Sequence, residues 1–108
     1  MTFIAMNRFK VVKGREKEFE AVWVNRKSLL EDVPGFEEFH LLRGPENEDH
    51  TLYASHTIWQ DRAVFEEWTR SEAFREAHKG AGARGDMYLG HPNFEGFDVL
   101  SKATVTSR

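Results

Sequence analysis

The alternation of apolar and polar side chains predicts a β-strand over residues 3–12, FIAMNRFKVV. Side chains two positions apart share a face of a strand. One face then carries Phe3, Ala5, Asn7, Phe9 and Val11, and the other carries Ile4, Met6, Arg8 and Lys10. Gly14 follows and ends the pattern. This strand therefore has one mostly apolar face on which a single amide, that of Asn7, stands out.

A helical spacing of apolar residues replaces the alternation from Arg15 onward. The inward stripe of this predicted helix runs through Phe19, Val22, Trp23, Arg26 and Leu29 or Leu30. The segment DVPGF ends the helix, because Pro34 disfavours helical geometry in the residue before it and Gly35 permits a tight turn.

The rest of the chain contains three more predicted strands, over residues 36–43, 50–59 and 93–101, with a polar turn over residues 43–49. Asp61 is a suitable N-cap for a short helix that carries Phe65 and Trp68. Ser71 is a suitable cap for a second one, whose Phe74 and His78 are four residues apart and share a face. Residues 79–86, KGAGARGD, follow as a loop.

The predicted order is β-α-β-β-α-β, with the second helix split in two, which indicates an α+β, ferredoxin-like fold. We expect one domain over residues 1–101 and a C-terminal tail over residues 102–108. Helices cover one face of such a sheet, whereas apolar residues such as Ile4 and Met6 lie on the other. A second copy of the chain could cover that face, so we expect a homodimer in which two sheets close into a dimeric α+β barrel.

Charge and composition narrow the classes of partner. The chain has 15 Lys and Arg residues against 18 Asp and Glu residues, a mildly acidic balance that argues against nucleic acid as a partner. No apolar run approaches the roughly 20 residues that cross a bilayer, and the N-terminus has no signal-peptide layout. With no cysteine, thiolate metal sites and disulfides are excluded. We therefore expect a cytoplasmic protein that acts without nucleic acid or membrane partners.

Two residues are candidates for chemistry. The Asn7 amide lies among apolar neighbours and needs hydrogen-bond partners, which could be backbone groups at the sheet edge or a ligand between sheet and helices. His78 falls on the inward side of its predicted helix, and no His, Asp or Glu has a spacing that would complete a protein-only metal site with it. It could simply end a helix, but a lone inward histidine also suits a metal that brings its other ligands, as heme does.

The set Asn7, Trp68 and His78 resembles that of IsdG-type heme-degrading monooxygenases, which belong to the antibiotic biosynthesis monooxygenase (ABM) superfamily of dimeric α+β barrels. The resemblance extends over residues 1 to about 101 and includes MNRF, VPGFEEFHLLRG, ASHTIWQDRAVFEEWTRSEAFREAH and FEGFDV. It implies that His78 binds the heme iron, that Asn7 donates to the ligand on the opposite side of the iron, and that Trp68 crowds the porphyrin out of plane.

The resemblance further implies that heme is both substrate and cofactor, and that O2 opens the ring and iron is released. Electrons would come from an external reductase or small reductant. We expect Trp23 and Phe65 to line the pocket, Arg26 to meet a propionate or a distal ligand, and Arg84 to lie near the propionates; ordinary packing is the alternative for Trp23 and Arg26. Two alternatives remain open: a cofactor-independent ABM monooxygenase acting on a phenolic polycyclic substrate, and a heme-binding dimer without turnover.

Overall fold

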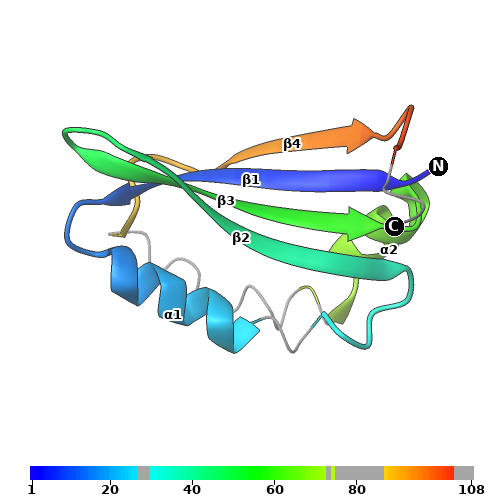
Figure 1. Cartoon of the computed structure of the whole chain (residues 1–108). Helices are drawn as coiled ribbons and strands as arrows, with labels where there is room; N and C mark the ends of the chain where they lie inside the picture. Colours follow the sequence, from blue (N-terminus) through cyan, green and yellow to red (C-terminus); the bar gives the residue numbers. More distant parts are fainter. Residues whose placement is uncertain (27–29, 73, 75–86, 104–108) are drawn as a thin grey trace, which may run out of the picture.

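The computed structural model describes residues 1–26, 30–72, 74 and 87–103 (Figure 1). Its elements are β1 (Phe3–Val12), α1 (Glu16–Arg26), β2 (Phe36–Glu46), β3 (His50–Trp59), α2 (Arg62–Thr69) and β4 (Asn93–Asp98). The strands form one antiparallel sheet in the order β2-β3-β1-β4. The α+β, ferredoxin-like prediction is thereby confirmed. None of the helices described is long and apolar enough to cross a membrane.

Both predicted turn glycines adopt the backbone geometry that glycine favours. Gly14, between β1 and α1, has a φ of 93°, and Gly35, just before β2, has a φ of 84°. Both values lie in the left-handed region, which other residues rarely adopt. At Gly35 space is also limiting, because an added Cβ would lie 2.5 Å from a methyl group of Val64 in α2. This turn and α2 are therefore packed directly against each other.

Two predicted strand ends were wrong. β2 continues to Glu46 instead of ending in a turn from residue 43, with an irregularity in its register between Arg43 and Glu46. Pro45 is tolerated there because β2 is an edge strand, where one side of the backbone needs no ladder partner. β4 ends at Asp98 and not at residue 101, although the Val99 amide still donates to the Thr2 carbonyl at 2.8 Å.

The predicted cap of α2 is confirmed. The Asp61 carboxylate accepts a hydrogen bond from the Val64 amide at 2.9 Å, and Asp61 itself has extended backbone geometry. The Ser71 hydroxyl accepts from the Phe74 amide at 3.1 Å, the same arrangement at the start of the second helical segment. Residues 75–86 lie outside the described residues, so the full split of the second helix stays a prediction.

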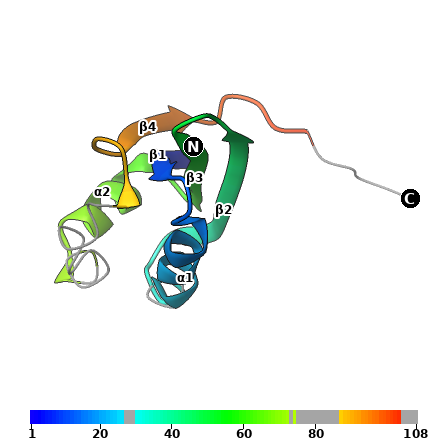
Figure 2. The same ribbon diagram turned by 90° about the vertical axis from the view of Figure 1, so that its left-hand side faces the viewer.

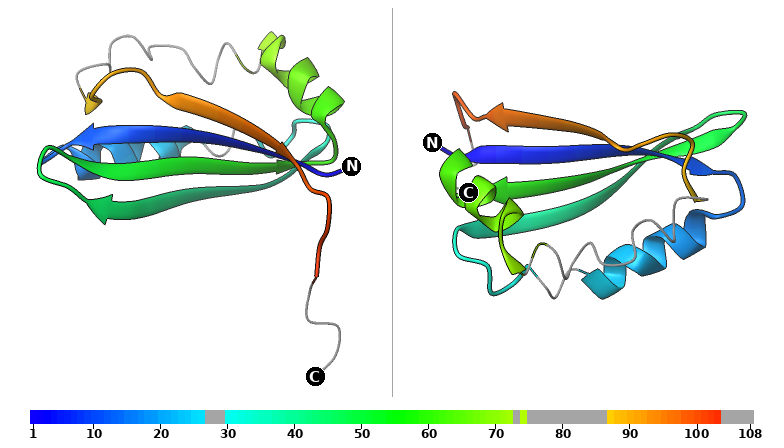
Figure 3. Two further views of the ribbon diagram at one scale, coloured as in Figure 1. Left: turned by 90° about the horizontal axis from the view of Figure 1, so that it is seen from above. Right: turned by 180° about the vertical axis from the view of Figure 1, so that it is seen from behind.

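The two helices lie on the same face of the sheet, at opposite ends of it (Figures 2 and 3). The buried side chains accordingly form two groups. The α1 cluster consists of Phe9, Val11, Phe19, Tyr53 and Met87, with Val22, Trp23, Leu41 and Tyr88 packed against it. The α2 cluster consists of Phe3, Ala5, Leu30 and Trp59, with Val33, Phe36, Phe39, Val64, Phe65 and Trp68 packed against it.

Polar side chains fasten α1 to β3. The buried Tyr53 hydroxyl donates to the Glu20 carboxylate, and Thr51 donates to Glu16 at 2.9 Å. Burial, together with the Glu20 bond, raises the pKa of Tyr53 to about 12. Backbone N–H donors, led by that of Glu16 itself, and the Thr51 hydroxyl lower the pKa of Glu16. At this end of the molecule, the polar side chains of α1 and β3 therefore satisfy one another's hydrogen-bonding capacity.

The opposite face of the sheet carries no described helix. We call it the open face; its larger apolar side chains are Ile4, Met6, Val12, Leu42, Leu52, Ile58 and Phe97. Leu42 and Phe97 are 41% and 46% exposed. The face predicted to meet a second copy of the chain is thus apolar and accessible, while the homodimer itself stays a prediction.

Candidate active site

On β1 and β3, the polar residues Asn7 and Ser55 lie between the two clusters, whereas beside β2 the clusters meet through Trp23 and Phe39. Asn7 pairs with Ser55 of β3 on one side and with Phe94 of β4 on the other, and Ser55 in turn pairs with Leu41 of β2. We call this line across the helix-covered face the Asn7 row. It lies between Ala5, a member of the α2 cluster, and Phe9, a member of the α1 cluster. The helix-covered face of the sheet therefore places the Asn7 amide between two aromatic groups.

The Asn7 side chain is half-buried. Within the part of the chain that the structure describes, its amide forms no hydrogen bond. A buried or partly buried amide normally has a partner, since leaving it without one costs free energy. Asn7 thus has hydrogen-bonding capacity that a ligand placed over the row could use.

One tryptophan side chain lies at each end of the helix-covered face. Trp23 of α1 stacks on Phe39 of β2 with ring centroids 5.7 Å apart and contacts Phe9 edge-on at 5.6 Å. Trp68 of α2 lies 5.2 Å from Trp59 and meets Phe74 edge-on at 4.9 Å. Both indoles are half-buried. Trp23 belongs to the α1 cluster and Trp68 to the α2 cluster, so the two flank the Asn7 row.

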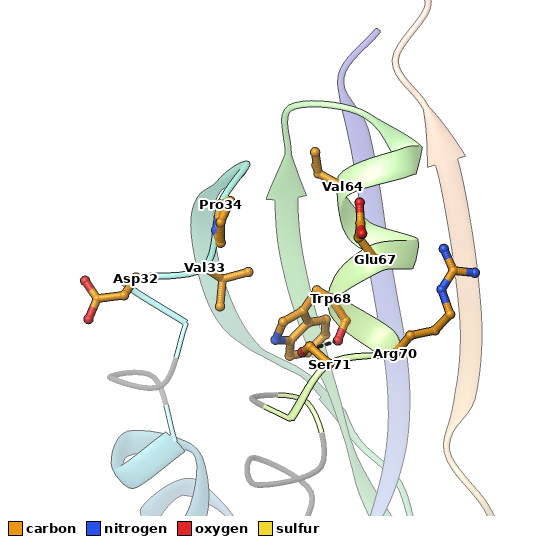
Figure 4. Close-up of a pocket in the computed structure, with 8 residues that line it drawn as sticks. All are labelled: Asp32, Val33, Pro34, Val64, Glu67, Trp68, Arg70 and Ser71. Carbon is orange, nitrogen blue, oxygen red and sulfur yellow. Dashed lines mark hydrogen bonds between the residues drawn. The ribbon is translucent and has the colours of Figure 1, made fainter.

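Beside Trp68 the structure has a cavity of about 560 Å³, within the range of small-molecule sites. Its lining comes from α2 and the turn before β2: Asp32, Val33, Pro34, Val64, Glu67, Trp68, Arg70 and Ser71. In Figure 4 the indole of Trp68 points toward Val33 across the cavity, whereas the Arg70 side chain points away toward β4. Trp68 lines this cavity, whereas Asn7 does not.

The remaining predicted site residues divide into two groups. Phe65 is described and packs with its aromatic neighbours, 5.2 Å from Phe3 and 5.4 Å from Trp59, and is not part of the cavity lining. Arg26 ends α1, but its side chain lies outside the described residues, as do His78 and Arg84. Among the residues that are described, no group of three His, Asp or Glu side chains is placed to hold a metal ion.

Sequence reasoning missed Phe94 and the turn residues Asp32, Val33 and Pro34. Phe94 is 52% exposed, and its ring stacks on that of Phe65 with centroids 5.7 Å apart and an angle of 7°. Its position opposite Asn7 depends on the register of β1 with β4, which are about 80 residues apart in the chain. The only sequence signal was the aromatic pair in NFEGF, whose members are three residues apart and so lie on opposite faces.

A family model described as antibiotic biosynthesis monooxygenase matches residues 2–80. The chain belongs to this family. The prediction made from Asn7, Trp68, His78 and the surrounding motifs is confirmed at the level of the family. Membership identifies the chain as an ABM monooxygenase family protein and leaves the substrate to be determined.

Proteins similar to this ABM protein include a heme-degrading monooxygenase and a cofactor-independent oxygenase. A heme-degrading monooxygenase of Shouchella clausii (strain KSM-K16) is 54% identical over 43 residues, which make up 40% of this chain and only 39% of that relative. The crystal structure of a MhuD variant with two manganese protoporphyrin IX molecules per active site is 25% identical, with a TM-score of 0.77 over 95% of this chain and 99% of that one.

SnoaB, a cofactor-independent oxygenase of Streptomyces nogalater, is 23% identical. Its TM-score is 0.69, over 94% of this chain and 95% of that one. At this level of identity the likeness shows a shared fold and nothing about substrate. The ABM fold therefore supports heme-dependent and cofactor-independent chemistry alike, and the side chains must decide between them.

Proposed function

We propose that this chain is a heme-degrading monooxygenase that binds heme as substrate and cofactor and opens its ring with O2 and external electrons. The observation that carries the proposal is the Asn7 row, where a half-buried amide without a hydrogen bond to a described residue lies between two aromatic clusters. The partial relative and the porphyrin-bound structure described above support it.

The described residues fit a porphyrin. A flat aromatic ligand needs apolar walls and few, well-placed polar groups, and the covered face supplies Trp23, Trp68 and the Asn7 amide. Heme, when bound, supplies the iron at which oxygen is activated. The protein needs to position the ring, orient the oxygen by a hydrogen bond and exclude water.

Each residue then has a distinct role. Asn7 would donate a hydrogen bond to the reacting oxygen, and Trp68 would press on the ring from α2. His78, which lies outside the described residues, would hold the heme iron, a role that rests on the family resemblance. Trp23 would line the pocket. Arg26 would meet a propionate or the reacting oxygen, and Arg84 would lie near the propionates.

The active form in this proposal is a homodimer formed through the open face. Exposing its apolar centre to water would cost free energy, and Leu42 and Phe97 on this face are each nearly half exposed. Two of its carboxylates are paired within the chain: Glu95 with Arg8 at 2.6 Å, and Glu38 with His40 at 2.6 Å. A second copy could therefore cover this part of the face without burying either carboxylate unpaired. Light scattering at micromolar concentration should give twice the chain mass; a monomer would contradict the dimer.

Hemin titration tests the proposed function directly. We expect the wild-type chain to give a shifted Soret band at stoichiometric hemin, and His78→Ala to lose it. His91→Ala is the matched control, because His91 is an exposed histidine in the segment before β4. Addition of ascorbate and O2 should then bleach the wild-type band, with product masses of an open-chain tetrapyrrole.

The possible outcomes separate the alternatives. A wild-type chain with no Soret shift would remove heme from the proposal and favour the cofactor-independent oxygenase. A Soret band that is stable to ascorbate and O2 would indicate a heme carrier without turnover. Hemin affinity unchanged in Arg26→Ala would remove that residue's propionate role.

A further inference from the structure

β4 has two exposed phenylalanines, one on each face of the sheet. Phe94 pairs with Asn7 and so shares the helix-covered face, whereas Phe97 pairs with Ile4 on the open face. Their exposed fractions are similar, 52% and 46%. Two large apolar side chains exposed on one short strand suggest two different occupants. The open face already has its candidate, a second copy of the chain, but Phe94 has none.

The surroundings of Phe94 define what its ring can contact. One face of the ring is stacked on Phe65 at 5.7 Å and 7°, so this side is already occupied by α2. Phe65 is itself held by Phe3 and Trp59 and cannot move freely. Phe94 is therefore fixed in orientation although half of its surface is exposed.

The neighbour of Phe94 on β1 is the Asn7 amide. Directly opposite residues of an antiparallel pair have Cβ atoms about 4.5–5.5 Å apart, so a ligand that accepts a hydrogen bond from Asn7 must pass beside the Phe94 ring. An exposed aromatic ring beside a polar donor is a recognition element for a flat aromatic ligand.

We propose that Phe94 is a binding residue that forms the β4-side wall of the ligand site and fixes the position of a porphyrin edge relative to Asn7. This inference rests on the proposed function for its ligand but concerns a residue outside the Asn7, Trp68 and His78 set. Because the wall limits rotation of the ring in its plane, Phe94 also sets which meso carbon lies next to the amide.

The test uses two probes, hemin and iron-free protoporphyrin IX, with wild type, Phe94→Ala, Phe94→Tyr and Phe97→Ala. Phe94→Ala should weaken the affinity for both porphyrins by about 2- to 10-fold, the value of one aromatic contact. It should also change the ratio of ring-opened isomers. Phe94→Tyr keeps the ring and should restore both properties. Phe97→Ala, measured where light scattering gives the wild-type mass, should leave both affinities unchanged.

Iron-free protoporphyrin separates this inference from the proposed function, because its binding needs no axial ligand. If wild type binds hemin and Phe94→Ala binds both porphyrins equally well, the Phe94 role is wrong and the heme proposal stands. If wild type binds protoporphyrin in a Phe94-dependent way but does not consume hemin, the wall is correct and the activity is wrong. If wild type binds neither porphyrin, both are wrong.

Discussion

The two ends of the helix-covered face differ in how they treat polar groups. At the α1 end, Tyr53 and Thr51 donate to carboxylates of α1, and each partner is part of the same fold. From the middle of the sheet toward α2, the Asn7 amide has no hydrogen bond to a described residue, and a cavity opens beside Trp68. The α1 end thus satisfies these polar groups within the fold, whereas the rest of the face has an amide and a cavity that a ligand could use.

The largest effect should come from removing an aromatic side chain from the α1 cluster. Phe19 is fully buried, and Phe19→Ala should lower the free energy of unfolding by about 3–5 kcal/mol. Urea denaturation measures this loss. In protein that remains folded, hemin affinity should also fall, because Phe19 packs against the proposed pocket residue Trp23 with ring centroids 6.1 Å apart; an unchanged affinity would mean that Trp23 keeps its position without Phe19.

A smaller loss is expected where the turn before β2 meets α2. Gly35→Ala places a side chain at positive φ and against Val64, so it should cost about 1–3 kcal/mol and displace α2. Because Trp68 is on α2, this variant should also weaken hemin binding. Gly14→Ala is the matched control, since it has a similar φ but open space around it. It should lower thermal stability and leave hemin binding intact.

The hydroxyl of Tyr53 should contribute about 0.5–1.5 kcal/mol through its bond to Glu20. The folded pKa of about 12 exceeds the ordinary value of 10, so the folded state keeps this proton longer than the unfolded state. The contribution is complete below pH 10 and is lost as pH rises toward 12. Tyr53→Phe should be less stable at neutral pH and should have a shallower alkaline decline in urea midpoint. If the alkaline decline in urea midpoint were unchanged in Tyr53→Phe, other ionisable groups would be its cause.

The smallest effect on stability should follow from Asn7→Leu, although its effect on activity should be large. Replacing a partly buried amide that has no hydrogen bond to a described residue by an apolar group of similar size should be neutral or slightly stabilising. Loss of a donor aimed at reacting oxygen should slow hemin consumption on the order of 100-fold. A clear loss of stability would show that the amide supports the fold. Thermal melts and ascorbate-driven bleaching measure the two effects separately.

Sequence patterns predicted the local part of this fold well. The alternation over residues 3–12 and 50–59 coincides with β1 and β3, and Asp61 caps α2 as expected. These features depend on residues close together in the chain. β2 ran past its predicted end because the tolerance for Pro45 depends on its place at the sheet edge, which only the complete strand order reveals.

The candidate site was predictable only in part. Asn7 and Trp68 stood out as an amide among apolar residues and as an indole on a helix stripe. The division of the core into two clusters could not be predicted, because it depends on the long-range registers that align Asn7 with Ser55 and Phe94. The cavity wall formed by the turn before β2 was missed for the same reason, since those residues were interpreted only as the end of a helix.

The position of Asn7 within the sheet has a consequence for the energy of the reaction. β1 is an interior strand, and Asn7 is flanked by partners on both sides, so its backbone is immobilised by two ladders. Only its two side-chain torsions remain to be set when a ligand arrives. In the proposed reaction, little backbone reorganisation would therefore be needed when charge develops on oxygen.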